Sequence, residues 1–319
     1  MDRPFISVII PVYNVEDYLA ECLDSCISQD ISDAEFICVN DGSRDSSGEI
    51  LEEYAGKDDR IRIVNKPNGG LSSARNAGMA ASGGDCILFL DSDDKFKPRA
   101  LNILKERIAK SGRADILIYC AYTFPADIEY EVWYKKTLQF KAASYTSFSP
   151  YVLFGERGSM PYVWRQAYRR GLLEESGVVF DEDLRYGEDV LFQMEIFPQA
   201  SAFEFIGDVL MSYRLKREGS IMDSVQNDPL KTVDNHYEMI LRAADVWKRK
   251  GWMDSFGKDF LYWALKFTIL KVRALPPDLK KQKAAEFFDR IAAPYGLEKY
   301  KSMIGMKGRM MWTAFLVMK

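Results

Sequence analysis

The first 120 residues alternate between short apolar runs and amphipathic segments, and this alternation constrains the fold more than any other feature of the sequence. The runs are rich in Ile, Val and Phe and carry few charges, as is typical of strands buried on both faces. They are Phe5–Val12, Glu35–Val39, Ile61–Val64, Cys86–Leu90 and Ile116–Tyr119. Between the first two, Glu16–Gln29 repeats apolar residues at helical spacing. The pattern predicts an α/β fold with a doubly wound, mostly parallel central sheet flanked by helices.

Two local signals place the starts of helices. Ser46 and Glu49 have the spacing of a capping box, so we expect a helix to begin near Asp45 or Ser46. Pro98 fits the first turn of the helix that follows the fourth apolar run, because proline is tolerated there.

The pattern changes after about residue 120, and from Pro229 the chain becomes mainly helical. We expect a strand or hairpin at 129–140, strands at 161–169 and 208–216, and helices at 187–197, 229–250, 254–273, 278–292 and 298–318. Gly219-Ser220 and Asn227-Asp228-Pro229 mark a boundary. The predicted domains are a first one over 1–222, with halves of about 1–120 and 121–222, and a helical C-terminal region over 223–319.

Charge and cysteine content exclude several classes of protein. The chain has 43 Lys and Arg against 47 Asp and Glu, a net charge of −4, which gives no support to a nucleic-acid binder. Its five cysteines form no CxxC pair, so we expect buried free thiols in a reducing compartment. No export signal is found, and no apolar run is long enough to span a bilayer, so we expect a cytoplasmic protein.

Polar residues follow the apolar runs where ligands bind in open α/β sheets, beyond the carboxyl ends of the strands. The four segments are Pro11–Asn14, Asn40–Ser43, Asn68–Gly70 and Asp91–Asp94. Because such ends meet at one edge of a sheet, the sequence predicts a binding site there.

The Asp91–Asp94 segment has three carboxylates in four residues, which repel one another unless a cation is present. Hard oxygen ligands suit Mg²⁺ or Mn²⁺. At this spacing one carboxylate can reach a metal while another takes a ribose hydroxyl. A solvated turn with helix-capping acids is the alternative, less favoured at the end of a buried strand.

Gly69 and Gly70 precede a helix, where backbone N–H groups can face a phosphate. Arg75, one turn into that helix, could pair with a diphosphate oxygen. By composition alone an ordinary Asn-Gly-Gly turn explains the segment equally well. Neither the dinucleotide-binding nor the P-loop pattern occurs.

Taken together, these motifs resemble those of family-two glycosyltransferases with the GT-A fold, a Rossmann-like architecture. Order and spacing match in Ser7–Asn14, Val39–Ser43, Gly69–Asn76 and Phe89–Asp94. The resemblance continues through Trp164 with Tyr168–Arg170, Arg185–Phe192, Tyr213-Arg214 and Gly219–Ile221, and so covers residues 5–222 but not the helical tail.

The resemblance implies a nucleotide-diphospho-sugar donor, a divalent cofactor (Mn²⁺ or Mg²⁺) and inversion at the anomeric carbon. By the same resemblance, Pro11 and Tyr13 would border the nucleoside and Asp41 would accept a hydrogen bond from the base. Asp91 would lie near the ribose or sugar, Asp93 would bind the metal, and Arg75 would approach the diphosphate. The remaining donor-binding positions would be Asn14, Gly42, Ser43, Gly69, Gly70 and Ser92.

On the acceptor side, the resemblance makes Asp189 the catalytic base, with Glu188 assisting. The positive end of the helix that they open favours ionised carboxylates, although the pair is also explained by ordinary N-terminal helix charge. Trp164 is expected to stack on the acceptor or to be a core residue, and Arg214 to contact the acceptor or diphosphate or to form a structural ion pair. Arg165-Gln166 departs from the Lys or Asn-Lys that related sequences often have after the tryptophan, which leaves acceptor recognition open.

The predicted function is therefore an inverting, metal-dependent glycosyltransferase that moves a sugar, with UDP as the first guess for the nucleotide, to an acceptor hydroxyl in surface polysaccharide or glycolipid synthesis. A sugar-phosphate nucleotidyltransferase would need a Gly-rich, basic loop where Pro11–Asn14 stands. A binding or scaffolding module without activity would be marked by loss of Asp93 or Asp189, and both are present.

Two features outside the motifs remain. Residues 299–319 carry five Lys and Arg, no acid and many apolar side chains, which is typical either of a segment lying on an anionic membrane or of a helix packed on its domain or in a homodimer. His236 is the only histidine, and a surface or core position on the 229–250 helix is favoured over a role as a metal ligand.

Overall fold

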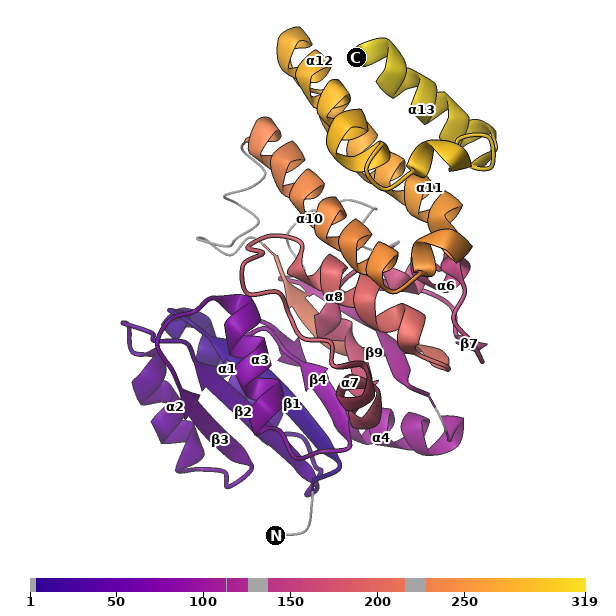
Figure 1. The fold of residues 1–319 in the computed structure, drawn as a ribbon. Helices are drawn as coiled ribbons and strands as arrows, with labels where there is room; N and C mark the ends of the chain where they lie inside the picture. Colours follow the sequence, from indigo (N-terminus) through magenta and orange to yellow (C-terminus); the bar gives the residue numbers. More distant parts are fainter. Residues whose placement is uncertain (1–3, 113, 126–136, 216–227) are drawn as a thin grey trace. The chain divides into compact units, whose positions relative to one another are not determined.

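The computed structural model describes residues 4–112, 114–125, 137–215 and 228–319. The chain forms two compact units, Met1–Leu215 and Lys216–Lys319 (Figure 1). The boundary expected at 222 and its marker Gly219-Ser220 lie outside the described residues.

One mixed sheet organises the N-terminal unit. Its strands are β1 (Ile6–Val12), β2 (Ala34–Asn40), β3 (Ile61–Asn65), β4 (Cys86–Phe89), β5 (Lys95–Phe96), β6 (Ile116–Phe124), β7 (Ala143–Tyr145), β8 (Gln166–Arg169) and β9 (Phe203–Arg214). The order is β3-β2-β1-β4-β8-β6-β9-β5, and β7 pairs with β9. The first four strands in this order and the β6–β9 pair are parallel, whereas β8 runs antiparallel to both neighbours. The predicted α/β fold with a mostly parallel sheet is confirmed.

Helices cover both faces of this sheet. They are α1 (Glu16–Ile27), α2 (Ser47–Ala55), α3 (Leu71–Ala81), α4 (Ala100–Ser111), α6 (Pro150–Phe154), α7 (Arg170–Ser176) and α8 (Glu188–Ile196). Along β2, Phe36 and Cys38 pack with the buried residues of α1 and α2, while Ile37 and Val39 pack with Ala74 of α3. Successive strand residues point to opposite faces, so a strand covered on both faces needs the uninterrupted apolar run that the sequence shows.

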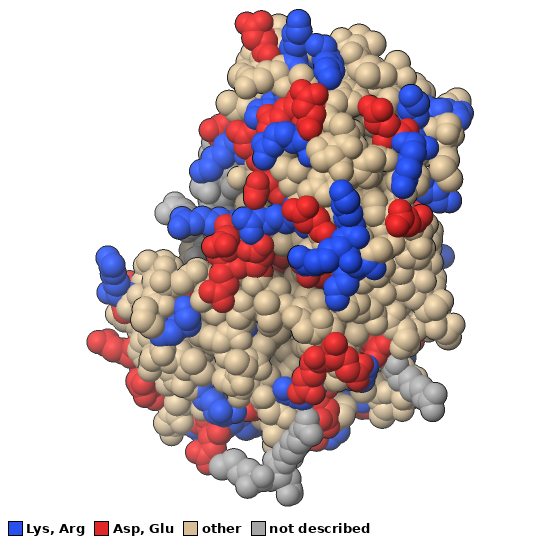
Figure 2. Space-filling model, in the orientation of Figure 1, with Lys and Arg blue, Asp and Glu red and all other residues tan. Residues whose placement is uncertain are grey.

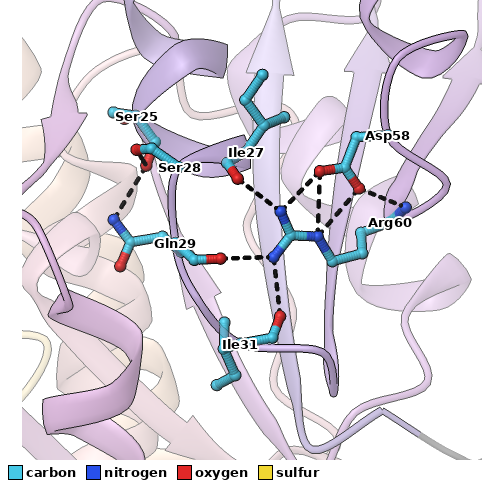
Figure 3. Close-up of polar contacts among 7 residues, drawn as sticks. All are labelled: Ser25, Ile27, Ser28, Gln29, Ile31, Asp58 and Arg60. Carbon is cyan, nitrogen blue, oxygen red and sulfur yellow. Dashed lines mark hydrogen bonds and ion pairs between the residues drawn. The ribbon is translucent and has the colours of Figure 1, made fainter.

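Arg60 fixes the end of α1 against the strands (Figure 3). Its guanidinium donates to the carbonyl oxygens of Ile27, Gln29 and Ile31 at 2.7–2.8 Å and pairs with Asp58 at 2.6 Å. The last carbonyls of a helix have no N–H partner within the helix; Arg60 supplies a donor to one of them, that of Ile27, and to two carbonyls of the turn that follows. This contact holds the turn that leads into β2.

Both expected helix starts differ in detail. Helix α2 begins at Ser47, and the Ser46 side chain makes no capping bond. Instead, Asp45 accepts from the Ser47 N–H, and Glu16, in the first turn of α1, accepts from the Ser46 N–H. These two carboxylates take the place of the expected capping box. Pro98 lies before α4, not in its first turn, because Arg99 adopts a left-handed conformation (φ 61°) and the helix begins at Ala100.

The region after residue 120 was predicted less well. The strand expected at 161–169 is shortened to β8, because Val163–Arg165 forms a 3₁₀ turn. The strand expected at 208–216 is β9, which begins five residues earlier, at Phe203. Most of the strand or hairpin expected at 129–140 lies outside the described residues, and Thr137 and Leu138 at its end are helical.

The C-terminal unit is helical, as expected. It contains α10 (Pro229–Arg249), α11 (Trp252–Arg273), α12 (Pro277–Glu286), which continues as a π-helical stretch (Phe287–Ala292), a 3₁₀ turn (Leu297–Tyr300) and α13 (Gly305–Met318). The helix expected at 298–318 is therefore two elements. None of the described helices has the length and apolar character needed to cross a bilayer.

His236 and the five cysteines, all outside the site, lie where the sequence predicts. His236 is buried in α10 with its ring 4.2 Å from that of Phe267, and burial lowers its pKa to about 4, which confirms a core position. All five cysteines are free and buried. On the face shown in Figure 2, acidic and basic side chains are interspersed.

Candidate active site

Direct contacts join the four polar strand ends into one site. The Asn14 N–H donates to Ser43 Oγ at 3.2 Å, which links the ends of β1 and β2. Asp41, after β2, accepts from the N–H groups of the loop that precedes α3. Arg75 on α3 reaches Asp91 at the end of β4. The predicted convergence of these loops at one edge of the sheet is present.

The Asp41 carboxylate organises the Gly-rich loop. It is buried, and it accepts from the N–H groups of Gly69 and Gly70 at 2.9 and 2.8 Å and from Lys66 Nζ at 2.6 Å. Gly42 has φ +72°, and a Cβ there would lie 2.9 Å from the Asn68 nitrogen, so the turn requires glycine. The two N–H groups proposed to face a phosphate are thus used by Asp41, and a phosphate would have to share them.

Arg75 lies at the centre of a buried charge cluster. Its side chain is 2% exposed; it donates to Asp189 at 2.6 Å, to Glu188 at 3.2 Å and to Asp91 at 3.1 Å. The guanidinium lies 5.2 Å from the centre of the Phe180 ring. Burial alone would lower the pKa of Arg75, but the three carboxylates outweigh it and raise the pKa, so the group stays charged. Arg75 therefore couples the acidic strand end to the two carboxylates at the start of α8.

The environment of Asp189 raises the pKa of its carboxyl well above the usual range. Loss of solvation raises its pKa to about 7; Arg75 opposes the shift, and Glu188 and Asp91 add to it. Gly187, with φ +83°, is the residue before α8, so the helix starts at Glu188, one residue after the expected start. The helix terminus was expected to keep Asp189 ionised, but burial has the larger effect. A carboxyl that titrates near pH 7 is suited to general-base catalysis.

The acidic turn after β4 is held by Arg214. The Arg214 N–H donates to Asp94 Oδ1 at 2.6 Å, and its Nε donates to the Asp93 carbonyl at 2.8 Å. The same guanidinium pairs with Glu21 on α1 and lies 4.4 Å from the centre of the Phe124 ring. Of the roles left open for Arg214, the structural ion pair is observed.

Asp94 and Asp93 differ in burial. Asp94 is buried, which raises its pKa well above the usual range, while Asp93 is half-buried at the strand end. The described residues contain no group of three or more potential metal ligands. A magnesium-type ion needs only one or two protein carboxylates when substrate phosphates and water complete its shell, so the all-oxygen donor set of this turn fits such an ion.

The residues expected to contact the donor base or the acceptor lie in different settings. Tyr13 is 43% exposed beyond β1, next to the buried Pro11. Trp164 is buried; its ring stacks on Tyr213 at 4.9 Å and 5° and on Tyr162 at 5.1 Å and 27°. An acceptor sugar can stack on Trp164 only if this aromatic group rearranges.

Arg165, at the position where the chain departs from the family pattern, is fully buried. It donates to the carbonyl oxygens of Thr137 and Gly158 at 2.7 and 2.8 Å, and burial lowers its pKa to about 10. These contacts give it a structural role beneath the site.

Sequence reasoning missed three residues that contact the site: Lys66, which pairs with Asp41, Glu21, which pairs with Arg214, and Phe180, whose ring lies beside Arg75. Lys66 directly follows β3 and so had a signal in its position at a strand end. Glu21 lies on the polar side of α1, and Phe180 lies in a loop with no distinctive pattern. The sequence therefore contains no signal for either residue.

Comparisons with known proteins show which family the chain belongs to. Residues 7–176 match the sequence model of the family described as Glycosyl transferase family 2. The chain is 40% identical over 223 residues to the uncharacterized glycosyltransferase EpsJ of Bacillus subtilis, covering 66% of this chain and 61% of EpsJ. The aligned part thus spans about six-tenths of that relative's length.

Two solved structures share the fold. S. aureus TarS 1–349 in complex with UDP-GlcNAc has a TM-score of 0.63 at 21% identity, covering 94% of this chain and 90% of that one. The mannosyltransferase PcManGT from Pyrobaculum calidifontis, in complex with GDP-Man and Mn²⁺, has a TM-score of 0.54 at 16% identity, covering 99% and 86%.

Proposed function

Because the chain belongs to glycosyl transferase family 2, we propose that it transfers a sugar from a nucleotide-diphospho-sugar to an acceptor hydroxyl, with inversion at the anomeric carbon. The observation that carries this proposal is the Arg75 cluster, which holds a carboxyl with a pKa of about 7 beside the acidic end of β4. A single displacement needs a base on the acceptor side and charge stabilisation on the donor side, and the cluster brings the two together.

The donor would occupy the edge of the sheet. Tyr13 offers an exposed ring for the nucleoside, and the Asp41 loop offers a carboxylate to the base and N–H groups to the diphosphate. UDP is our first choice of nucleotide. The structure of TarS, which shares the fold, is a complex with UDP-GlcNAc, which supports a nucleotide-sugar donor for this chain.

Asp93, with Asp91 beside it, would hold a divalent ion (Mn²⁺ or Mg²⁺). Such an ion, when bound, supplies Lewis-acid stabilisation of the leaving diphosphate. Arg214 keeps the Asp93 and Asp94 backbone in place through its bonds to Asp93 O and Asp94 Oδ1. The position of the Asp93 carboxylate therefore depends on Glu21 and Arg214 as well as on the strand.

Asp189 would take the proton of the acceptor hydroxyl, and Glu188 would assist by raising its basicity. Asp189 Oδ2 accepts from the Val163 N–H at 3.3 Å and Oδ1 from Arg75, so both oxygens are oriented. An acceptor in surface polysaccharide or glycolipid synthesis is the class we propose, on family resemblance.

The test is a screen of nucleotide-sugars with Mn²⁺ by thermal shift, followed by calorimetry and assay of donor hydrolysis or transfer. A ligand that binds only the folded protein raises its unfolding temperature. Asp93→Ala should abolish metal-dependent donor binding, whereas Asp278→Ala, a surface carboxylate on α12, should leave it unchanged. Unchanged donor binding in Asp93→Ala contradicts the metal assignment; donor binding by the wild-type protein without any turnover favours a silent binding module.

A further inference from the structure

The C-terminal helix α13 is apolar on two opposite faces. Its inner face packs into the helical unit through Gly308, Trp312 and Phe315, which are buried. Phe315 stacks on Phe287 at 4.5 Å, and Trp312 meets Phe288 edge-on at 4.9 Å. The core contacts of α13 are therefore complete without its outer face.

The outer face is a second apolar stripe, formed by Met306, Met310, Thr313 and Val317. Their spacing of three or four residues places them in one row along the helix. Met310 is 66% exposed and Val317 is 82% exposed. A row of exposed apolar side chains along one helix face is typical of an interaction site, so this row calls for a partner.

A groove of about 640 Å³ runs along this stripe, between α11 and α13. Its wall is completed by two arginines, Arg273 at the end of α11 and Arg309 on α13. The two helices lie side by side in Figure 1, where α13 is yellow. The groove thus combines methionine side chains, which adapt to irregular surfaces, with two guanidinium groups at its edge.

The lining of the groove contains two arginines and no carboxylate. Within the part of the chain that the structure describes, neither Arg273 nor Arg309 forms an ion pair with a carboxylate. Residues 299–319 contain five Lys and Arg and no Asp or Glu. Two of these cations are paired, Lys299 with Asp254 and Lys319 with Asp289, so the positive charge that the groove offers beside its apolar contact comes from Arg273 and Arg309.

We propose that this surface, the α11–α13 groove with its methionine stripe, docks on a bilayer that contains anionic phospholipid. Methionine and valine side chains would enter the boundary between headgroups and acyl chains, and Arg273 and Arg309 would extend their charged ends to lipid phosphates. A second copy of the chain fits less well, because it would bring a second pair of the same arginines into the interface, and the groove lining contains no acid to balance them. The inference is independent of the proposed transfer reaction.

The experiment is vesicle co-sedimentation of the full chain, with phosphatidylcholine alone or with about one third phosphatidylglycerol added. Wild-type protein should sediment with the anionic vesicles only. Arg273→Gln with Arg309→Gln should weaken that partitioning by roughly 30-fold, since each Lys or Arg near an anionic surface contributes about fivefold. The matched control, Arg249→Gln with Lys250→Gln, removes the same charge at the exposed end of α10 and should partition like wild type.

A second variant tests the apolar part. Met306→Ser with Met310→Ser keeps every charge and alters only exposed side chains, and it should also lose most of the partitioning. Thermal unfolding and donor hydrolysis in solution, unchanged in all variants, would show that the fold and the catalytic unit are intact. Three outcomes would each overturn the proposal. The wild-type protein could sediment equally with neutral and anionic vesicles, or the control pair could lose as much partitioning as the groove variant. The protein could also bind no vesicles and form a dimer, seen by light scattering, that Met310→Ser dissociates.

Discussion

The two units of the chain depart from ordinary globular packing in opposite ways. The N-terminal unit buries charge: Arg75 is 2% exposed and contacts three carboxylates. The helical unit exposes apolar surface: Met310 and Val317 are more than half exposed. In most proteins charges stay in water and large apolar stripes are covered.

Each departure lowers the stability of the isolated chain, and the difference indicates what each region binds. A buried ion pair is rarely more stable than apolar residues of the same volume, so the Arg75 cluster is better explained by its effect on Asp189 than by stability. An exposed apolar stripe forgoes about 25 cal/mol for each Å² left in water, which a covering surface would restore. In our two proposals, the first unit binds a small charged ligand and the second an extended apolar surface.

The largest effect is expected at the buried charges. Asp189→Asn keeps the shape of the side chain but removes the base, so turnover should fall by ~10²–10⁴-fold while donor affinity is nearly unchanged. Glu174→Gln, an exposed carboxylate on α7, should keep wild-type turnover. Steady-state kinetics and calorimetry measure both quantities. Retained turnover in Asp189→Asn removes this residue from the role of base.

The next largest effect is on the free energy of unfolding, and it should differ between the two faces of α13. Phe315→Ala opens a cavity against Phe287 and should lower the free energy of unfolding of the helical unit by about 3–5 kcal/mol. Met310→Ala, five residues earlier on the exposed face, should change it by no more than about 0.5 kcal/mol. Urea denaturation of the full chain, followed by tryptophan fluorescence, measures both. A large loss in Met310→Ala would mean that the stripe is already packed, which contradicts the contrast between the faces.

Sequence reasoning predicted the parts of this molecule that local pattern determines. The five apolar runs became strands with boundaries shifted by a few residues, except that β6 extends to Phe124, because a strand covered on both faces has an uninterrupted apolar signal. Polar strand ends located the site, because parallel strands place their carboxyl ends together. The contacts that site residues make with one another could not be predicted from the sequence. Arg75 contacts Asp189, 114 positions away in sequence, and no local pattern predicted this contact; that Arg75 also approaches a diphosphate stays a prediction.

The same limit applies to the pKa of Asp189. Its position at the start of α8 is visible in the sequence and favours ionisation. The burial that outweighs this effect comes from β4, α3 and the Val163 turn, which lie far away along the chain. Likewise, the 3₁₀ turn that shortens β8 and the left-handed Arg99 before α4 depend on tertiary packing, which propensity alone does not show.

The smallest expected effect is on the pH dependence of turnover, and it tests the Arg75 cluster most directly. Asp189 must be ionised to accept a proton, and its pKa is about 7, so turnover should fall as the pH drops through 7 and level off above it. Arg75 is the group that opposes this raised pKa. In Arg75→Gln the pKa of Asp189 should therefore rise further, and the acid limb of the pH–rate profile should move to higher pH.

At pH 7 the Arg75→Gln variant should turn over roughly tenfold more slowly than wild type, and by pH 9 much of the difference should be gone. Arg107→Gln, which removes an exposed arginine paired with Asp208, should leave the profile where it is. Misplacement of the base without a change in its pKa would lower the rate by the same factor at every pH. A displaced limb thus separates electrostatic tuning of Asp189 from simple loss of structure, and a uniform loss would mean that the buried arginine serves packing, like Arg165 beneath the same site.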